Sequence, residues 1–415
     1  MDNPARVLLI SPHGSYRIAP FLKAAKTLDI PVMLVTDGPK LPLPQNLPGL
    51  HLDFSADPNA IETLCSQLNS VNIRGVVATD DSTLVLAASV AEKIGIPHNS
   101  IESAQLSRRK DSARERQRIN GLPTPWFLQL DMQHPLDVQI QSVNYPCVVK
   151  PIAMSASRGV IRADNRDQLV TAIRRVEKLV NSKATGDAAR YLLLESFISG
   201  TEIAVEGLLS DGNLQILTIF DKPGVSQGPY FEETCYVAPS ALPDETVLLV
   251  SAEIQKVCEA YGLVHGPIHA ECRLNADGIW ILEIGARTIG GLCAKLFKDL
   301  IGIGLEELVL VHAAKGRVEK SKITQSIGVM MIPVSASGVL RRVEGLKSAR
   351  QVANIVEIII DVRDGDVLIP WPEGSTYPGF IFSKAESPKL VEESLRAAHA
   401  NLRFITAPVI PVQFQ

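Results

Sequence analysis

The chain has 415 residues, of which 46% are hydrophobic and 21% charged, as in globular proteins that bury large cores. The net charge of −4, from 41 basic and 45 acidic residues, argues against nucleic acid or an anionic membrane as a partner. Six cysteines without a CxxC pair argue against zinc and disulfides, and the absence of a long apolar run predicts a cytoplasmic protein without signal peptide or membrane span.

The N-terminal part alternates between short apolar runs and helical patterns. Residues 6–12 and 31–37 are predicted as buried strands, 19–30 as a helix, and 75–97 as strand, turn and helix. This alternation predicts a parallel, doubly wound sheet. The SPHGSY sequence after the first strand lacks GxGxxG, so a plain βα turn is favoured over a phosphate site and no dinucleotide is expected.

A charged helix is predicted in the middle of residues 97–127. It ends at Gly121, because Pro123 and Pro125 cannot continue it. Its basic side chains are expected to form a solvated face, although Lys110 also has a second interpretation. They are Arg108, Arg109, Lys110, Arg114, Arg116 and Arg118.

A hairpin with a small-residue loop is predicted over residues 145–163. Its first strand ends in Lys150, and the loop runs from Ser155 to Gly159. The backbone N–H groups of such a loop can lie over an anion while the lysine supplies positive charge. An ordinary β-turn is the alternative.

Three more strands are predicted over residues 190–222, the last two joined by an SDG turn. Glu195 and Glu202 flank the sequence SFISGT between the first two. A carboxylate and free backbone groups at a strand end suit a purine nucleoside. The backbone groups can hydrogen-bond to the edge of the purine, and the carboxylate can accept a hydrogen bond from a ribose hydroxyl. A solvated strand end is the alternative.

Two carboxylates lie inside neighbouring apolar stretches of residues 266–291. Glu271 and Glu283 belong to two predicted strands separated by an NADG turn. The spacing alone leaves open whether this pair has a function or is simply turned to solvent.

These features, in this order, resemble the ATP-grasp superfamily, in which ATP is held between two α+β subdomains. The resemblance covers about residues 1–320. The residues that carry it are Lys110, Lys150, the 155–159 loop, Glu195, Glu202, Glu271, Glu283 and Arg287.

The resemblance implies a site for ATP and a divalent metal. Glu271 and Glu283 would hold Mg²⁺, with Mn²⁺ as the alternative metal. One departure is Gly285, where many ATP-grasp enzymes have an asparagine as a further ligand. The residues that it assigns to ATP are Lys110 and Lys150 for the phosphates, Ser155, Ser157 and Gly159 for the loop over them, Glu195 and Phe197 for the adenine, and Glu202 for the ribose.

The sequence EIGARTIGG resembles the carboxylate–amine ligase branch typified by L-amino-acid ligases. The resemblance assigns Arg287 to an acyl phosphate or substrate carboxylate, with Gly290 and Gly291 beside it; a salt bridge to Glu271 is the alternative for Arg287. In the substrate loop, residues 228–240, Glu233 matches the family's glutamate. Tyr236 replaces the histidine of the pattern, which puts the amino-acid preference in doubt.

His269 could assist in the same site, but a buried histidine hydrogen-bonded in the core is favoured. Residues 326–405 are predicted as strand, GVL turn, helix, strand, DGD turn, strand and helix, which resembles the C-terminal domain of the L-amino-acid ligase branch.

The expected architecture combines α/β and α+β elements in an ATP-grasp fold. A Rossmann-like N-terminal domain covers residues 1–105 and the ATP-grasp domain 106–320, with a mobile lid at about 125–195. A small C-terminal α/β domain covers residues 321–415.

The function implied is ATP-dependent ligation of a carboxylate to an amine through an acyl phosphate, with release of ADP and phosphate. Amino acids, or an amino acid and another carboxylate, are the expected small-molecule substrates. Lys150, Glu283 and Arg287 would act in catalysis by positioning and charge stabilisation. The alternatives are an enzyme of the biotin-carboxylase or purine-pathway type and a nucleotide-binding protein without turnover. A homodimer is the default assembly.

Overall fold

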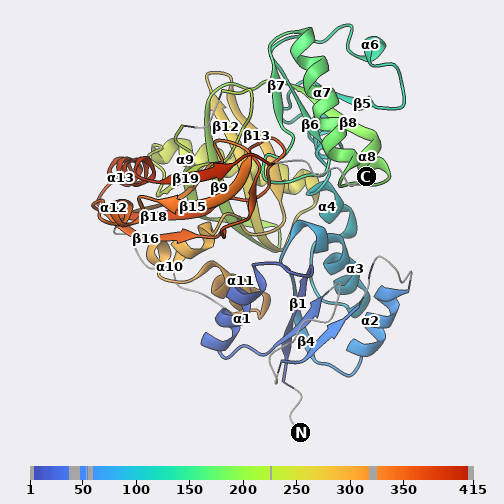
Figure 1. Cartoon of the computed structure of the whole chain (residues 1–415). Helices are drawn as coiled ribbons and strands as arrows, with labels where there is room; N and C mark the ends of the chain where they lie inside the picture. Colours follow the sequence, from blue (N-terminus) through green and yellow to red (C-terminus); the bar gives the residue numbers. More distant parts are fainter. Residues whose placement is uncertain are drawn as a thin grey trace, which may run out of the picture.

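The computed structural model describes residues 4–36, 47–52, 54, 59–224, 227–316 and 325–409. In these residues the chain forms four β-sheets with helices packed on them (Figure 1). Two of the predicted positions lie outside the described residues: position 37, the predicted end of the second strand, and the domain boundary at 320/321.

The N-terminal sheet is parallel, with strand order β3-β2-β1-β4. This confirms the predicted parallel sheet, and its strands are apolar because helices cover them. Gly75 in β4 is needed because α11 comes so close that an added Cβ would lie 2.2 Å from the Ala313 carbonyl oxygen. The elements are β1 (Arg6–Ser11), α1 (Ile18–Thr27), β2 (Val32–Thr36), β3 (Gly49–His51), α2 (Ala60–Leu68), β4 (Ile73–Ala78), α3 (Leu84–Ile94) and α11 (Leu305–Ala313).

The predicted charged helix is present as α5 (Lys110–Ile119), which follows α4 (Ile101–Leu106). The prediction of a wholly solvated basic face is wrong for Arg114, whose side chain is only 1% exposed. Arg114 points into the protein because a buried partner, Glu195, and two backbone carbonyls accept its hydrogen bonds.

A separate four-stranded sheet, order β5-β8-β6-β7, forms what we call the small unit (residues 127–196). The predicted hairpin is confirmed as the antiparallel pair β6–β7. Helix α7 packs on the sheet through apolar residues at helical spacing, among them Leu169, Ile173 and Val176. The elements are β5 (Phe127–Asp131), α6 (Leu136–Gln139), β6 (Cys147–Pro151), β7 (Ile161–Ala163), α7 (Arg166–Asn181), α8 (Asp187–Arg190) and β8 (Tyr191–Ser196).

The largest sheet has eight antiparallel strands in the order β13-β12-β9-β10-β11-β14-β18-β16. It runs without interruption from the middle of the chain into the C-terminal part. The strands are β9 (Thr201–Ser210), β10 (Asn213–Asp221), β11 (Cys235–Ala238), β12 (Gly266–Asn275), β13 (Gly278–Gly285), β14 (Ser326–Met331), β16 (Ile355–Ile360) and β18 (Gly379–Ala385). The helices beside them are α9 (Asp244–Tyr261), α10 (Phe297–Ile301), α12 (Leu346–Arg350) and α13 (Pro388–Ala400).

A three-stranded sheet of β15 (Gly338–Glu344), β17 (Val367–Leu368) and β19 (Arg403–Ala407) completes the C-terminal part. The prediction of a GVL turn is wrong, because Gly338 and Val339 begin β15. Val339 pairs with both Val367 and Ala407, so partners distant in sequence determine the structure here.

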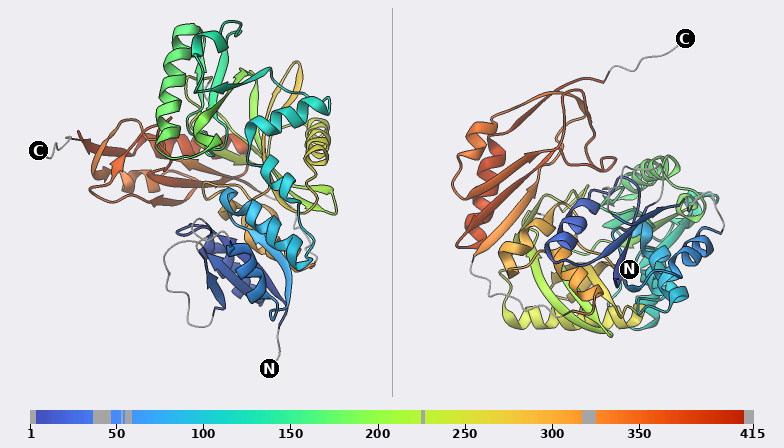
Figure 2. Two further views of the ribbon diagram at one scale, coloured as in Figure 1. Left: turned by 90° about the vertical axis from the view of Figure 1, so that its right-hand side faces the viewer. Right: turned by 90° about the horizontal axis from the view of Figure 1, so that it is seen from below.

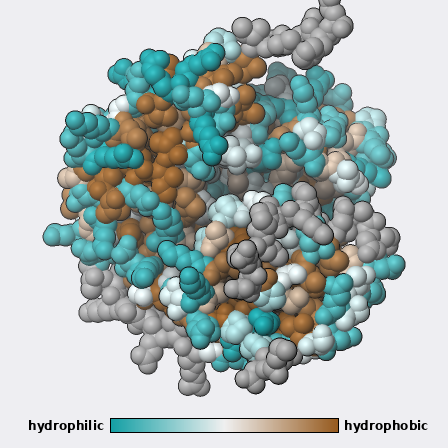
Figure 3. All heavy atoms as spheres, turned by 60° about the horizontal axis from the view of Figure 1, so that its bottom comes forward, coloured by the Kyte–Doolittle hydropathy of each residue, from teal (hydrophilic) through white to brown (hydrophobic). Residues whose placement is uncertain are grey.

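Further views show the C-terminal strands and helices to one side of the molecule, with the small unit and the N-terminal sheet at opposite ends (Figure 2). One face of the molecule mixes hydrophilic and hydrophobic atoms, with most of the hydrophobic ones toward its left side (Figure 3). Within the described ranges, no helix is long and apolar enough to cross a membrane.

Candidate functional site

A cavity of about 490 Å³ lies where the N-terminal sheet, the small unit and the large sheet meet. Gly159 is the one predicted site residue outside its lining, and the Gly159 N–H donates to the Pro372 carbonyl at 3.0 Å. The predicted residues that line the cavity are Lys110, Lys150, Ser155, Ser157, Glu195, Phe197, Glu202, Glu233, Tyr236, Glu271, Glu283, Arg287, Gly290 and Gly291.

The two carboxylates predicted to hold a metal lie directly opposite each other. Glu271 in β12 pairs in register with Glu283 in β13. Lys222 Nζ is 3.1 Å from the Glu271 carboxylate, and Lys110 Nζ is 2.9 Å from that of Glu283. Each carboxylate is therefore neutralised by a lysine. A divalent cation would compete with the two lysines for the carboxylate oxygens.

The donor set fits Mg²⁺ better than a metal enclosed by protein ligands alone. Among the described residues, no group of three or more His, Cys, Asp or Glu side chains is arranged to hold a metal. Mg²⁺ usually takes one or two carboxylates and completes its shell with water and substrate phosphates. Glu271 and Glu283 are such a pair, and this also accommodates Gly285 in place of an asparagine.

The charge on Glu271 is stabilised from two sides. Burial raises the pKa of its carboxyl, but the charges of Lys222 and His269 more than offset this and hold that pKa well below its usual range. His269 is buried, and its Nδ1 is hydrogen-bonded to Glu206. Burial lowers the pKa of His269, yet the Glu206 carboxylate raises it to about 9. The histidine is thus buried and hydrogen-bonded, as the sequence favoured, and it also lines the cavity, with its Nε2 3.8 Å from the Glu271 carboxylate.

Lys150, at the end of β6, forms a buried charge cluster with Glu195. The Lys150 Nζ lies 2.6 Å and the Arg114 Nε 2.8 Å from different oxygens of Glu195. Burial lowers the pKa of Lys150, and so do the charges of Arg114 and Lys110, although Glu195 opposes them. Both Glu195 oxygens are thus already engaged within the protein.

Glu202 is engaged in a similar way. Its two oxygens accept hydrogen bonds from Lys222 at 2.6 Å and from Arg273 at 2.9 Å. Arg273 also lies over the ring of Phe197, whose backbone N–H donates to Pro146. The structure therefore adds Lys222 and Arg273 as functional candidates that the sequence interpretation missed.

The loop over the cavity has an unusual backbone. Ala156, Ser157 and Gly159 have positive φ angles of 58°, 52° and 69°. At Gly159 a side chain would also clash, because a Cβ would lie 2.9 Å from Pro151 Cγ. Lys110 connects to this loop, since its Nζ donates to the Met154 carbonyl at 2.7 Å.

Arg287 is held by a residue in the turn that follows β4 of the N-terminal sheet. Its Nε donates to Asp81 Oδ1 at 2.9 Å, so the alternative of a salt bridge to Glu271 does not apply. Burial lowers the pKa of Arg287, but Asp81 and Glu283 raise it above its ordinary value. Asp81 follows β4, and ligand residues commonly lie at the carboxyl ends of parallel strands, which is the signal that could have identified it.

Tyr236 and Glu233 contact each other in the predicted substrate loop. The Tyr236 hydroxyl donates to Glu233 at 2.9 Å, and Ser157 Oγ donates to the other Glu233 oxygen at 3.4 Å. Burial and the charge of Glu271 raise the pKa of Glu233. Beside them, Gly291 at φ 62° passes so close to Met331 that a Cβ would lie 2.3 Å from its sulfur.

The C-terminal part also contributes to the cavity wall. Residues that sequence reasoning did not single out are Met331, Asp361, Ser375, Thr376, Tyr377 and Phe380. No local motif marks them, because they come together only through the continuation of the large sheet.

A cavity between a parallel N-terminal sheet, a small four-stranded unit and a long antiparallel sheet, with buried lysines facing paired carboxylates, defines an ATP-grasp protein. Family models agree. Residues 143–295 match the ATP-grasp domain, 22–98 the ATP-grasp N-terminal domain, and 330–407 the L-amino acid ligase C-terminal domain 2.

Several known proteins are similar to this chain in sequence or in structure. An L-amino acid ligase structure from Bacillus licheniformis aligns with a TM-score of 0.83 and 29% identity over 98% of this chain and 100% of that one. Dapdiamide A synthase of Enterobacter agglomerans is 23% identical over 81% of this chain and 80% of its own length. Alanine–anticapsin ligase of Bacillus subtilis is 23% identical over 58% of this chain and 55% of its own.

The chain belongs to the ATP-grasp superfamily, with an L-amino acid ligase C-terminal domain, and is an L-amino-acid-ligase-like, ATP-dependent ligase. The ATP-grasp fold predicted from the sequence is confirmed. A phosphoribosylglycinamide synthetase structure from Anaerococcus prevotii, with a TM-score of 0.66 at 17% identity, shares the fold alone.

Proposed function

We propose that this enzyme joins the carboxylate of one small molecule to the amine of another through an acyl phosphate, with amino acids as substrates. The observation that carries the proposal is the registered pair Glu271 and Glu283, facing Lys110, Lys150 and Arg287 in one cavity. The names of the relatives, above all the L-amino acid ligase structure, support amino acids as the substrate class.

In this proposal ATP lies under the 155–159 loop. Lys150 and Lys110 contact its phosphates, and Mg²⁺ held by Glu271 and Glu283 neutralises their charge when bound. The Lys150 ammonium is held between Glu195 and the cavity, so it needs little reorganisation to meet a phosphate.

The substrate carboxylate attacks the γ-phosphorus of ATP and displaces ADP, which gives an acyl phosphate. This step is needed because the free carboxylate does not react with an amine. The amine then attacks the acyl carbon and expels phosphate. Arg287, fixed by Asp81, would stabilise the negative charge of the acyl phosphate. Glu233, with its raised pKa and its bond from Tyr236, would lie near the amine.

Phosphate release from Mg²⁺ and ATP, measured against amino acids and other carboxylates singly and in pairs, tests the proposal. A parallel set contains hydroxylamine, which traps acyl phosphates as hydroxamates. Hydroxamate from one carboxylate, with phosphate release stimulated by a second amine, is the expected result. Phosphate release that depends on bicarbonate instead would contradict it, and so would nucleotide binding without any turnover.

A further inference from the structure

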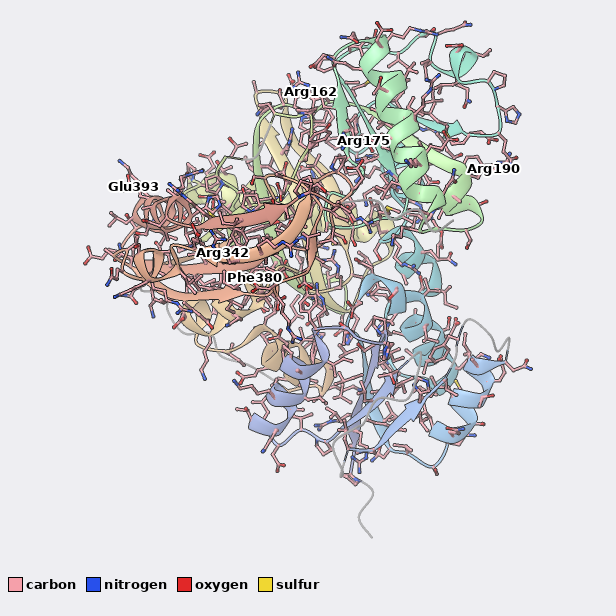
Figure 4. The ribbon with its side chains drawn as sticks, viewed as in Figure 1. Arg162, Arg175, Arg190, Arg342, Phe380 and Glu393 are labelled. Atoms are coloured by element: carbon pink, nitrogen blue, oxygen red, sulfur yellow. The ribbon has the colours of Figure 1, made fainter. Side chains whose placement is uncertain are left out.

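Residues 371–377, between β17 and β18, extend from the small unit to the cavity. The indole N–H of Trp371 donates to the Ala156 carbonyl at 3.0 Å, and the Pro372 carbonyl accepts from Gly159 at 3.0 Å. Glu373 forms a two-point ion pair with Arg175 of α7, one contact of which is 2.7 Å. Figure 4 shows Arg162 and Arg175 on the side of the small unit toward the large sheet, and Arg190 on its far side.

The other end of the same segment belongs to the cavity wall. Ser375, Thr376 and Tyr377 line the cavity, beside Phe380 at the start of β18. Trp371 is 4% exposed and its ring stacks on that of Tyr377, with centroids 4.8 Å apart. One stacked aromatic pair, of a buried Trp371 and a half-buried Tyr377, therefore connects the cavity wall to the 155–159 loop.

Tyr377 carries an unsatisfied polar group. Its hydroxyl oxygen is shielded from bulk solvent and has no hydrogen-bond partner among the described residues. Buried hydroxyls are almost always hydrogen-bonded, because leaving one unpaired is costly. Other atoms of the residue line the cavity, so a small shift of the ring would bring the hydroxyl to a bound substrate, which is the partner that the site leaves open.

The surroundings of Tyr377 restrict what that partner can be. The Phe380 ring, with its centroid 6.2 Å from that of Tyr377, makes the wall beside it apolar, and Met331 adds to the apolar lining of the cavity. Burial, and then the negative charges of Glu233 and Glu232, raise the pKa of the Tyr377 phenol well above its ordinary value, so the hydroxyl stays neutral. At a pH where these two carboxyl groups are ionised, they would repel a substrate carboxylate at this position and favour a group that presents N–H or O–H.

We propose that Tyr377 is a specificity-determining residue, whose hydroxyl bonds a neutral hydrogen-bond donor at the end of an amino-acid side chain, such as a carboxamide or hydroxyl. Through its stack on Trp371, the same contact stabilises the 155–159 loop over the nucleotide. The proposal rests on the proposed function for its substrate class, and it names which amino acids the cavity selects.

The test is a binding comparison between the wild-type protein and Tyr377→Phe, which removes only the hydroxyl. Thermal shifts are measured with Mg²⁺, ADP and the twenty amino acids, scored on the matched pairs glutamine–glutamate, asparagine–aspartate and serine–alanine. At least one donor-bearing member should bind the wild type roughly tenfold more tightly than its partner. In Tyr377→Phe that preference should disappear, while the ligand-free melting temperature stays equal or rises.

Ser383→Ala is the matched control. Ser383 also has an unpartnered buried hydroxyl, but it lies in β18 outside the cavity lining, so its loss should not change selectivity. Trp371→Phe keeps an aromatic ring on Tyr377 and removes the indole donor. It should abolish the protection that the preferred amino acid gives the 155–159 loop against protease.

The outcomes separate this proposal from the proposed function. A preference that persists in Tyr377→Phe, or a wild type that does not distinguish the pairs, overturns the role of Tyr377 even if hydroxamate forms. A preference lost in Tyr377→Phe without any hydroxamate in the wild type supports the subsite and contradicts acyl-phosphate ligation.

Discussion

The two ends of the cavity differ in how their charges are balanced. At the end that we call the paired end, Lys150, Glu195, Arg114, Glu202, Arg273 and Lys222 form ion pairs with one another. None of these side chains is more than 9% exposed. At the open end, the side chains of Glu283 and Asp81 are each 28% exposed, although each has a cationic partner.

This difference predicts which substitutions affect the stability of the fold and which affect mainly the rate of the reaction. Removing one member of a buried ion pair leaves an uncompensated charge and destabilises the fold, whereas a partly exposed pair contributes little. Substitutions at the paired end should therefore lower both stability and nucleotide affinity. Substitutions at the open end should lower turnover and leave the fold nearly unchanged.

The largest effect is expected for Glu283→Gln. The amide is nearly isosteric but neutral, so it binds Mg²⁺ poorly and should lower Mg²⁺-dependent ADP formation by roughly 10²–10³-fold or more. The melting temperature should stay close to that of the wild type. Glu357→Gln, at an exposed glutamate of β16, is the control. Wild-type turnover in Glu283→Gln would contradict the metal assignment.

Arg287→Lys tests the open end without changing its charge. Lysine cannot reproduce the planar guanidinium that reaches both Asp81 and the Thr288 carbonyl. We expect kcat to fall by about 10²-fold with the ATP dissociation constant unchanged. Steady-state kinetics together with calorimetry measure the two quantities. If lysine retains full activity, charge alone is required and the fixed geometry is not.

Lys150→Ala is the corresponding test of the paired end. It should raise the ATP dissociation constant roughly tenfold, about 1.4 kcal/mol. It should also lower the unfolding free energy by up to about 3 kcal/mol, because Glu195 then keeps only Arg114. Calorimetry and urea unfolding give the two numbers. Weaker ATP binding without loss of stability would remove the distinction between the two ends.

The sequence predicted most of the open end because its signals are local. Glu271 and Glu283 lie in two strands joined by a short turn, so their register follows from the hairpin itself. At the paired end, the signal for Lys150 is also local, since it lies next to the end of β6 just before the loop. The apolar alternation of the N-terminal part similarly sufficed to predict its parallel sheet.

The missed residues depend on contacts between distant parts of the chain. Asp81 and Arg287 are 206 positions apart, and Arg114 meets Glu195 across 81. Glu195 and Glu202 were predicted as nucleotide contacts, but the cations that engage them come from α5, β6, β12 and the residue directly after β10. Tyr377 reaches the cavity only because the C-terminal strands extend the large sheet. Residue identity and spacing do not encode such pairings without the fold.

The smallest expected effect concerns Glu232, a carboxyl that no cation among the described residues pairs with. Burial raises its pKa from 4.5 to about 7, although the Val334 N–H donates to it at 3.3 Å. The folded state therefore holds this proton more tightly than the unfolded chain, so the contribution of Glu232 to stability falls as pH rises from about 4.5 to about 7. Because the carboxyl is partly exposed, Glu232→Gln should gain no more than about 1 kcal/mol at pH 8, and almost nothing at pH 4. Urea unfolding of both proteins at the two pH values measures this. An equal effect at both would show that the amide acts through packing rather than through the missing charge.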